Sequence, residues 1–365
     1  MVTEFVYAQP VKILFGAHRF DHLSEILKEH GIQRAVVACD RFFSERIRGM
    51  MQDTKEIVAV FDDVEENPQL SGVIETARLA KEHGADCVIG IGGGSTIDTA
   101  KFAAAVAADP EIAERCWKGE VPFPKETLHI VAVPTTAGTG SEVTQVSVVS
   151  HGRDKKTINN PVFMPLLAIV DPYLSSTVPP RTTMNTGIDA MAHALEGYWS
   201  KNHQPISDLC AIEAVRLILE NLERAYRDGN DLEARTKMAY ASLLGGLSFA
   251  LPKTAGSHAC SYPLSEDYHL PHGEACAFTL DSFVRINADE RLEYLSRAAG
   301  LKDTAELAER IRALKETAGL RRTLSDLGDV DMDKLVRDCA AHPLMQNNPV
   351  QMTEEKLREM FEALQ

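Results

Sequence analysis

The chain lacks the features that mark several classes of protein. Its 365 residues contain no uninterrupted apolar run of about 18 residues, the length that a membrane-spanning helix needs. Its basic runs are no longer than a pair such as Lys155-Lys156, and 53 Asp and Glu outnumber 38 Lys and Arg to give a formal charge of −15. Binding to nucleic acid needs a dense basic surface instead. We therefore expect neither a membrane nor a nucleic acid as partner.

Paired cysteines are missing as well. The seven cysteines form no C-x-x-C motif, and some, such as Cys87 in ADCVIGI, lie within apolar runs. Buried free thiols are typical of this pattern. The first ten residues, MVTEFVYAQP, lack the basic and apolar regions of a signal peptide, so we expect a cytoplasmic protein.

The composition that is present is that of a globular protein, with 44% hydrophobic residues. A single core stops growing near roughly 250–300 residues, so this length predicts two domains. In the first half, short β-branched runs alternate with helical stretches, which is the pattern of βα units around a parallel sheet. The predicted strands cover residues 11–16, 34–40, 56–64, 86–94, 128–134, 143–150 and 166–172.

The second half of the chain has a different pattern. After Pro179-Pro180 the apolar residues recur at the 3.6-residue spacing of helices, as in DLCAIEAVRLILENLERAYRDG (208–229). The proline pair favours a boundary at this point. We predict a Rossmann-like α/β domain over residues 1–180 and an all-α domain over residues 181–365.

A glycine-rich turn in DCVIGIGGGSTIDTAK (86–101) joins a predicted strand to a predicted helix. Gly92, Gly93 and Gly94 would let backbone N–H groups approach a phosphate at the helix N-terminus. The spacing Gly90-x-Gly92-x-x-Ser95 lacks the last glycine of the dinucleotide fingerprint. A pyrophosphate site and a plain tight turn therefore both remain open.

Asp40 ends the second predicted strand, at the carboxyl edge of the sheet, where cofactors bind. A carboxylate there would accept hydrogen bonds from the ribose hydroxyls and repel a 2′-phosphate, which favours NAD over NADP. The same residue could instead cap the helix that follows. The sequence leaves both roles open.

Histidines gather in one part of the chain. Of twelve, five fall within residues 193–272, namely His193, His203, His258, His269 and His272. Asp189 and His193 stand at i, i+4, so a helix would project both side chains from one face. With His258 and His272 they form one carboxylate and three imidazoles, a ligand set that suits Fe²⁺ or Zn²⁺ and leaves a position open for a substrate oxygen.

Five motifs in this order resemble those of the iron-dependent (group III) alcohol dehydrogenases. They are GGGSTIDTAK (92–101), PTTAGTGSEVT (134–144), DPYL (171–174), GIDAMAHALEGYWS (187–200) and PHGEACA (271–277). The resemblance implies the dehydroquinate synthase-like fold of that family, in which an α/β nucleotide domain and a helical metal domain have the site in the cleft between them. It also implies a homodimer, and closed pairs are the commonest assembly.

The resemblance also assigns roles to residues. The metal ligands map to Asp189, His193, His258 and His272. The nucleotide contacts map to Asp40, Asn67, Gly94, Ser95, Asp98, Thr135, Thr136, Thr144 and Lys156. Gly93 of the glycine turn is added to this set.

One position departs from the family pattern. Many members carry a second histidine four residues after the third ligand, near the substrate, and Tyr262 stands there in this chain. A phenol is a poorer proton relay near pH 7 than an imidazole, so either Tyr262 or His269 would have to serve. The segment SHACSYPLSEDYHLPHG (257–273) also resembles the hydroxyethylphosphonate dehydrogenase (phosphonoacetaldehyde reductase) subgroup, whose substrate is anionic. Lys253 and Arg181 are the nearest cationic candidates for such a substrate.

These features predict a metal-dependent NAD(H) alcohol dehydrogenase or aldehyde reductase acting on a small primary alcohol or aldehyde. Three other functions remain open. A lyase like dehydroquinate synthase would be expected to show a Glu/His/His ligand set in place of Asp/His/His/His. A non-catalytic nucleotide-binding protein would need no complete ligand set. The metal-free glycerol-type or maleylacetate-type relatives are the third possibility; the second type lacks the full ligand set, and bound metal would separate this chain from them.

Overall fold

The computed structural model describes residues 4–152 and 154–364. The chain divides into two compact units. The α/β unit comprises Ala8–Thr136 and Ser141–Ser175, and the helical unit comprises Met1–Tyr7, Ala137–Gly140 and Ser176–Gln365. The helical unit thus takes in a short loop from the first half of the chain, which a single boundary at residue 180 does not foresee.

The α/β unit is built on a parallel sheet. Its strands among the described residues are β1 (Lys12–Phe15), β2 (Ala35–Cys39), β3 (Ile57–Phe61), β4 (Cys87–Gly92), β5 (His129–Pro134) and β8 (Leu167–Val170). They lie in the order β1-β8-β5-β4-β2-β3, and every neighbouring pair is parallel. The predicted parallel sheet is confirmed.

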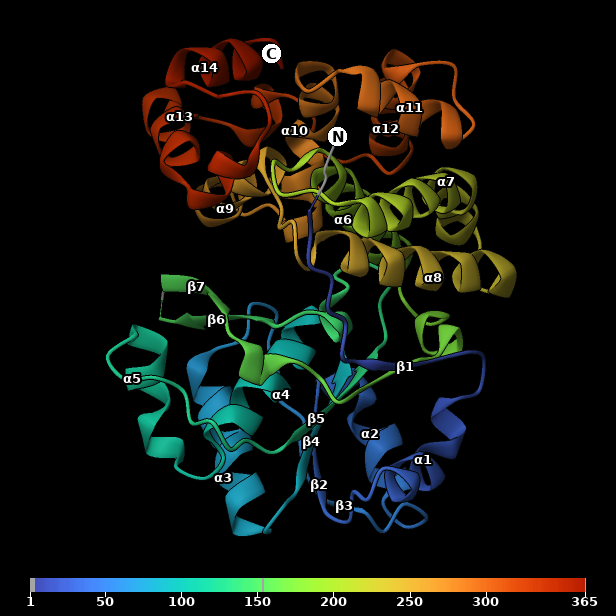
Figure 1. Cartoon of the computed structure of the whole chain (residues 1–365), viewed down its shortest axis with the longest axis vertical. Helices are drawn as coiled ribbons and strands as arrows, with labels where there is room; N and C mark the ends of the chain where they lie inside the picture. Colours follow the sequence, from blue (N-terminus) through green and yellow to red (C-terminus); the bar gives the residue numbers. More distant parts are fainter. Residues whose placement is uncertain (1–3, 153, 365) are drawn as a thin grey trace. The chain divides into compact units, whose positions relative to one another are not determined.

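Helices cover both faces of this sheet (Figure 1). They are α1 (Leu23–Glu29), α2 (Arg41–Met50), α3 (Leu70–Glu82), α4 (Gly94–Val106) and α5 (Ala113–Lys118). Alternate residues of one strand face opposite sides: Val37 of β2 packs in the core with α1 and α2, whereas Val36 packs with α3 and α4. Strands buried on both faces are apolar throughout, which is why they are visible in the sequence.

A second, two-stranded sheet belongs to the same unit. Strands β6 (Val146–His151) and β7 (Asp154–Asn159) pair antiparallel. The sequence predicts the first of these strands but not the second. The reason is that β7, DKKTIN, is polar and mostly exposed, so it has no apolar run.

The helical unit confirms the predicted all-α region. Its helices are α6 (Pro180–Trp199), α7 (Pro205–Arg227), α8 (Leu232–Phe249), α9 (Gly256–Tyr268), α10 (His272–Ile286), α11 (Glu290–Ala298), α12 (Thr304–Thr317), α13 (Met332–Ala341) and α14 (Glu354–Glu362). Helices α6 and α7 approach closely at Gly187. The glycine permits this approach, since a Cβ at this position would lie 2.2 Å from Leu222 Cδ1. None of the helices among the described residues has the length and apolar character needed to cross a membrane.

Candidate active site

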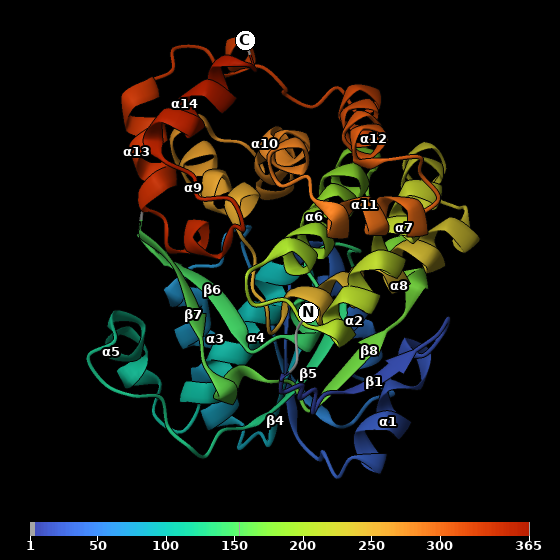
Figure 2. The ribbon, with the colours of Figure 1, turned by 45° about the horizontal axis from the view of Figure 1, so that its top comes forward.

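Three helices of the helical unit supply the predicted metal ligands. Asp189 and His193 lie one turn apart on α6, His258 lies in the first turn of α9, and His272 is the first residue of α10. The three helices pack against one another (Figure 2). The structure therefore brings residues from distant parts of the sequence to one place.

Asp189 is the centre of this cluster. Its Oδ1 lies 3.6 Å from His258 Nε2 and 3.8 Å from His272 Nε2. Asp189 and His258 are buried, and neither Asp189 Oδ1 nor His258 Nε2 has a hydrogen-bond partner among the described residues. Leaving such buried polar atoms unpaired is costly, and a cation between them would remove that cost. The residues present therefore fit a divalent metal.

His193 contributes to the same cluster in a different way. Its Nδ1 donates a hydrogen bond of 3.2 Å to the carbonyl of Gly138, in the loop that belongs to the helical unit. This bond leaves Nε2 as the nitrogen available to a metal. The ring stacks on Phe249, with 4.2 Å between ring centroids, and its centroid is 4.6 Å from that of His258.

A compact group of donor atoms in the described residues differs from the predicted set by one residue. One donor atom each from Asp189, His258, His272 and Cys276 lie within 4.8 Å of one another. Cys276 follows His272 by one turn of α10, and its Sγ is 3.8 Å from His272 Nε2. The assignment of His193 as a ligand remains a prediction.

Glu196 orients the buried His258 and was not found from the sequence. One of its carboxylate oxygens accepts a hydrogen bond from His258 Nδ1, and the other accepts bonds from the backbone N–H groups of Ser257 at 2.6 Å and His258 at 3.3 Å. Such a carboxylate fixes which ring nitrogen faces a metal. Since Glu196 stands seven residues after Asp189 on α6, helical spacing is the signal that could have identified it.

Asp189 and His193 have the charge states of metal ligands. Burial acts to raise the pKa of Asp189, but the charges of His193 and the other imidazoles outweigh burial and lower it. Burial lowers the pKa of His193 to about 4. An ionised carboxylate and a neutral imidazole are the forms that bind metals. For His258, burial acts to lower the pKa, but the nearby Cys276, Glu196 and Asp189 outweigh it and raise the pKa.

The glycine turn of the α/β unit lies where the sequence places it. Gly92 ends β4, Gly93 is the N-cap of α4, and Gly94 begins that helix. A Cβ on Gly92 would lie 2.4 Å from Thr96 Oγ1, so close packing of strand and helix already requires this glycine. Thr135 and Thr136 follow the neighbouring strand β5, and the backbone N–H of Thr135 donates to the carbonyl of Gly92 at 2.9 Å. Gly93, Gly94, Ser95, Thr135 and Thr136 thus share one edge of the sheet.

Two family models match the chain. The model described as iron-containing alcohol dehydrogenase covers residues 10–172, and the C-terminal model of the Fe-containing alcohol dehydrogenase family covers residues 183–365. The chain belongs to the iron-containing alcohol dehydrogenase family. It is therefore an oxidoreductase of alcohols and aldehydes, and the cofactors of its family are a divalent metal and NAD.

Individual relatives agree over the whole chain. The long-chain-alcohol dehydrogenase 1 of Geobacillus thermodenitrificans is 36% identical and aligns over 99% of this chain and 96% of its own length. Alcohol dehydrogenase 4 of Saccharomyces cerevisiae is 33% identical, over 98% and 97% of the two chains. The solved sulfoacetaldehyde reductase of Bifidobacterium kashiwanohense, in complex with NAD⁺, is 38% identical with a TM-score of 0.95 and covers 100% of this chain and 99% of its own. The predicted family and fold are confirmed.

Two of the nucleotide residues implied by the family lie in a buried polar cluster. Asp98 accepts hydrogen bonds from Ser141 Oγ at 2.7 Å and from the backbone N–H of Val148 at 2.9 Å. Lys101 Nζ donates to Ser141 Oγ at 2.8 Å and to Thr144 Oγ1 at 3.1 Å. These bonds attach α4 to the segment before β6. Nucleotide contact by Asp98 and Thr144 remains a prediction.

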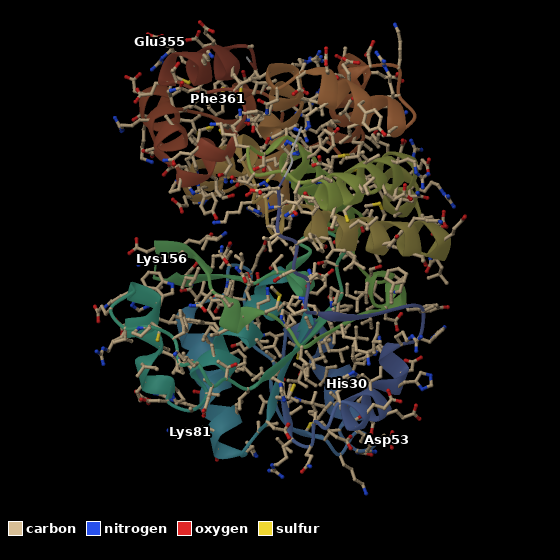
Figure 3. The ribbon with its side chains drawn as sticks, in the orientation of Figure 1. His30, Asp53, Lys81, Lys156, Glu355 and Phe361 are labelled. Atoms are coloured by element: carbon tan, nitrogen blue, oxygen red, sulfur yellow. The ribbon has the colours of Figure 1, made fainter. Side chains whose placement is uncertain are left out.

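The other nucleotide residues of the family pattern already have protein partners. Asp40 caps α2, since its Oδ1 accepts from the backbone N–H of Phe43 at 3.2 Å. Asn67 has a left-handed backbone (φ 58°), and its Oδ1 accepts from Lys155 Nζ at 2.7 Å. Lys156, labelled on the hairpin in Figure 3, has its Nζ 4.2 Å from the ring centroid of Trp117. The capping role of Asp40 is realised, and its role at the ribose remains a prediction.

The position where many family members have a second histidine is surrounded by other groups here. Tyr262 lies one turn after His258 on α9, and its ring stacks on His342 with 4.3 Å between centroids. His342 joins α13 to the short helix η7 (Pro343–Asn347). His269, in contrast, is exposed and ends α9 in a left-handed conformation (φ 55°). His342 was missed because nothing in the sequence connects it with a residue 80 positions earlier.

The two cationic candidates for an anionic substrate differ in their surroundings. The side chain of Arg181 is 65% exposed, and its Nη2 lies 3.2 Å from Oε2 of the buried Glu274. Glu274 also binds Arg321 Nε at 2.8 Å and the backbone N–H of Arg321 at 3.0 Å. Arg181 can therefore leave Glu274 without leaving that carboxylate unpaired. Lys253 is exposed, at a left-handed position (φ 68°).

Proposed function

We propose that this chain interconverts a small primary alcohol and its aldehyde with NAD(H) at a divalent metal, Fe²⁺ or Zn²⁺, held by Asp189, His193, His258 and His272. The supporting observation is the pair of unpartnered buried atoms, Asp189 Oδ1 and His258 Nε2, which lie 3.6 Å apart. When bound, the metal supplies Lewis-acid polarisation of the substrate oxygen. Oxidation of the alcohol transfers a hydride to NAD⁺ and releases one proton.

Several residues prepare the helical unit for this reaction. Glu196 holds His258 with its Nε2 facing Asp189, and Gly138 holds His193 through Nδ1. Burial keeps the imidazole of His193 neutral, since it lowers the pKa to about 4. The side chain of His272 is 39% exposed, which marks the side of the cluster that a substrate can reach.

We assign the proton path to Tyr262 together with His342, in preference to the exposed His269. The ring of Tyr262 stacks on that of His342, and imidazole is the side chain whose ordinary pKa is nearest neutrality. The phenol of Tyr262 by itself offers no such group. Burial lowers the pKa of His342, so at pH 7 it is a neutral proton acceptor.

The proton path predicts that His342→Ala lowers kcat for alcohol oxidation about 10- to 100-fold, within the usual range for acid–base groups. The loss should be larger below pH 7 than at pH 9, where hydroxide can accept the proton. His269→Ala is the matched control and should retain kcat. If His269→Ala lost activity and His342→Ala retained it, the proton relay would be His269 instead of His342.

For the nucleotide, we propose that the pyrophosphate lies at the N-terminus of α4, against Gly93, Gly94 and Ser95. Thr135 and Thr136 lie at the same edge of the sheet. Asp40 would face the ribose with the carboxylate oxygen that does not cap α2, and Asn67 and Lys156 would contact the cofactor from the loops beside that edge. Asp98 and Thr144 would act indirectly, because their hydrogen bonds hold α4 in place.

A short aldehyde with an anionic head is the second candidate substrate, and the similarity to sulfoacetaldehyde reductase favours it. Sulfonate and phosphonate heads would both bind a guanidinium or ammonium group. Each charged hydrogen bond of this kind contributes about 1.5–3 kcal/mol, which corresponds to ~10- to 100-fold selectivity over a neutral aldehyde. Arg181 is the better candidate because Arg321 can retain Glu274 when Arg181 turns to a substrate.

The test compares kcat/KM for sulfoacetaldehyde, phosphonoacetaldehyde and propanal with NADH. We expect the anionic aldehydes to be preferred, and Arg181→Met to reduce that preference while propanal is unaffected. Lys253→Met tests the second cation, and Lys302→Met, at an exposed site of the same unit, is the control. Equal values for propanal and the anionic aldehydes would leave a general short-chain alcohol dehydrogenase.

We also propose a cytoplasmic homodimer. The reason is the family resemblance together with the frequency of two-fold pairs among soluble oligomers. Sedimentation at the mass of one chain would contradict the dimer.

A further inference from the structure

Cys276 is the one thiol of the described residues that belongs to the compact group of donor atoms. It is buried on α10, one turn after His272, and its Sγ is 3.8 Å from His272 Nε2. Other cysteines of the helical unit have different neighbours: the thiols of Cys260 and Cys339 lie beside each other in the apolar core. Cys276 therefore differs from an ordinary buried thiol in facing imidazoles.

A second observation shows where a ligand belongs. Among the residues that the structure describes, Asp189 Oδ1 and His258 Nε2 have no hydrogen-bond partner, and the side chains that carry them are only 4% and 6% exposed. His272 Nε2 lies 3.8 Å from Asp189 Oδ1 on one side and 3.8 Å from Cys276 Sγ on the other. These atoms surround a single position, and Cys276 contributes one of its sides.

We propose that Cys276 is a ligand of the metal and completes the donor set of Asp189, His258 and His272 when no substrate is bound. This inference rests on the metal centre described under Proposed function. Coordination forms a bond from sulfur to the metal and releases the thiol proton to solvent, with no change of oxidation state. His193 remains a ligand, and the substrate oxygen takes the position of the thiolate when the substrate binds.

The consequence of a sulfur ligand is a change in metal preference. Thiolate is a softer ligand than carboxylate or imidazole, and it favours Zn²⁺ over Fe²⁺. The thiolate adds one soft donor to the carboxylate and imidazoles, and sulfur is a common ligand of Zn²⁺. Cys276 thus determines which metal this chain prefers and competes with the substrate for the position it occupies.

Cobalt substitution provides the test, because a thiolate bound to Co²⁺ gives an intense near-ultraviolet charge-transfer band that nitrogen and oxygen ligands do not give. The full-length protein, stripped of metal and loaded with one Co²⁺ per chain, should show this band. Cys276→Ala should lose the band and still bind one Co²⁺. Cys339→Ala removes a buried thiol outside the donor group and should keep the band.

Each outcome bears on a separate claim. One bound Co²⁺ without the band, or a band that survives in Cys276→Ala, overturns the role of Cys276 and leaves the proposed function intact. Failure to bind Co²⁺ at all overturns both the metal centre and the cysteine. Should Cys276→Ala not fold, X-ray absorption of the zinc-loaded wild type decides: sulfur at about 2.3 Å supports the proposal, and a shell of nitrogen and oxygen alone contradicts it.

Metal affinities give an independent measure. Cys276→Ala should lower the affinity for Zn²⁺ about 10-fold or more, with a smaller change for Fe²⁺. Cys276→Ser, which retains the volume but offers a hard oxygen, should resemble Cys276→Ala. Equal losses for both metals would show that the thiol only fills space.

Discussion

Two buried clusters of charged side chains, one in each unit of the molecule, are balanced in opposite ways. In the α/β unit, Asp98 and Lys101 are both buried, and nearby hydroxyl and backbone groups satisfy them. In the helical unit, Asp189 and His258 are also buried, yet their facing atoms have no hydrogen-bond partner within residues 4–152 and 154–364. Asp98 and Lys101 are therefore satisfied within the protein, whereas Asp189 and His258 offer donor atoms that a cation would satisfy.

Glu142 shows how the α/β cluster remains balanced without a ligand. It is buried near Lys101, and one of its oxygens has no partner among the described residues. Burial raises the pKa of Glu142 to about 7, so its charge is partly removed by protonation. In the helical unit, by contrast, the imidazoles lower the pKa of Asp189 and keep its charge. Buried charge alone is therefore a weak indicator of a site, and unpartnered atoms on an ionised group are a stronger one.

The largest expected effect comes from replacing the aspartate of each cluster by alanine, because the two variants should lose different properties. Asp189→Ala should lower the affinity for Zn²⁺ more than ~100-fold and abolish activity, because it removes the central donor. Asp98→Ala should keep one metal per chain but lower the free energy of unfolding by about 3–5 kcal/mol, because it leaves Lys101 buried without its carboxylate. Elemental analysis and calorimetry measure both. Loss of metal in the Asp98 variant would show that the clusters do not differ as described.

A smaller effect concerns the pH dependence of Glu142. Its pKa is about 7 in the folded protein and near 4.3 in an unfolded chain, so between these values the folded state holds a proton that the unfolded state releases. The stability that this group contributes is therefore present at low pH and is lost as the pH rises toward 7.

The side chain of Glu142→Gln cannot ionise. From pH 5 to pH 8 the free energy of unfolding of the wild type should therefore fall by about 2.5 kcal/mol relative to that of the variant. Thermal unfolding at the two pH values measures this difference. The control is Glu66→Gln, which removes an exposed charge of the same unit. A constant difference between wild type and Glu142→Gln across this range would contradict the proposed balance.

The smallest effect concerns Asp40, where capping and cofactor choice can be separated. Asp40→Asn keeps a good N-cap for α2 but removes the charge. We expect the ratio of kcat/KM for NADPH to that for NADH to rise about tenfold, because a 2′-phosphate no longer faces a carboxylate. Asp53→Asn, at an exposed site, is the control. A wild-type preference for NADPH would show that Asp40 does not contact the ribose.

The sequence predicts those parts of the fold whose pattern is local. The buried strands β2 and β4 are apolar throughout, and the pair Asp189 and His193 shows its spacing directly. Helix α9 is harder to recognise, because Gly256 begins it, Pro263 lies inside it and most of its first half is buried. A helix without a polar face has no amphipathic period.

The site shows the same limit. His272 and Cys276 have the same i, i+4 spacing as Asp189 and His193. Cys276 could therefore have been predicted from the sequence once residues 272–286 were recognised as a helix. The role of His342 beside Tyr262 could not be predicted from the sequence, and neither could that of the loop Ala137–Gly140 beside His193. Only tertiary packing brings these segments together. Residues on one helix can be predicted together, whereas partners from separate segments require the fold.

Anomalous diffraction at the zinc edge, from crystals of the full chain loaded with Zn²⁺, tests the central claim most directly. The account predicts one strong peak per chain within coordination distance of Asp189 Oδ1 and His258 Nε2, the two atoms that the protein leaves unpartnered. It predicts no peak at the cluster of Asp98 and Lys101. A zinc peak elsewhere in the chain, with none between Asp189 and His258, would contradict it.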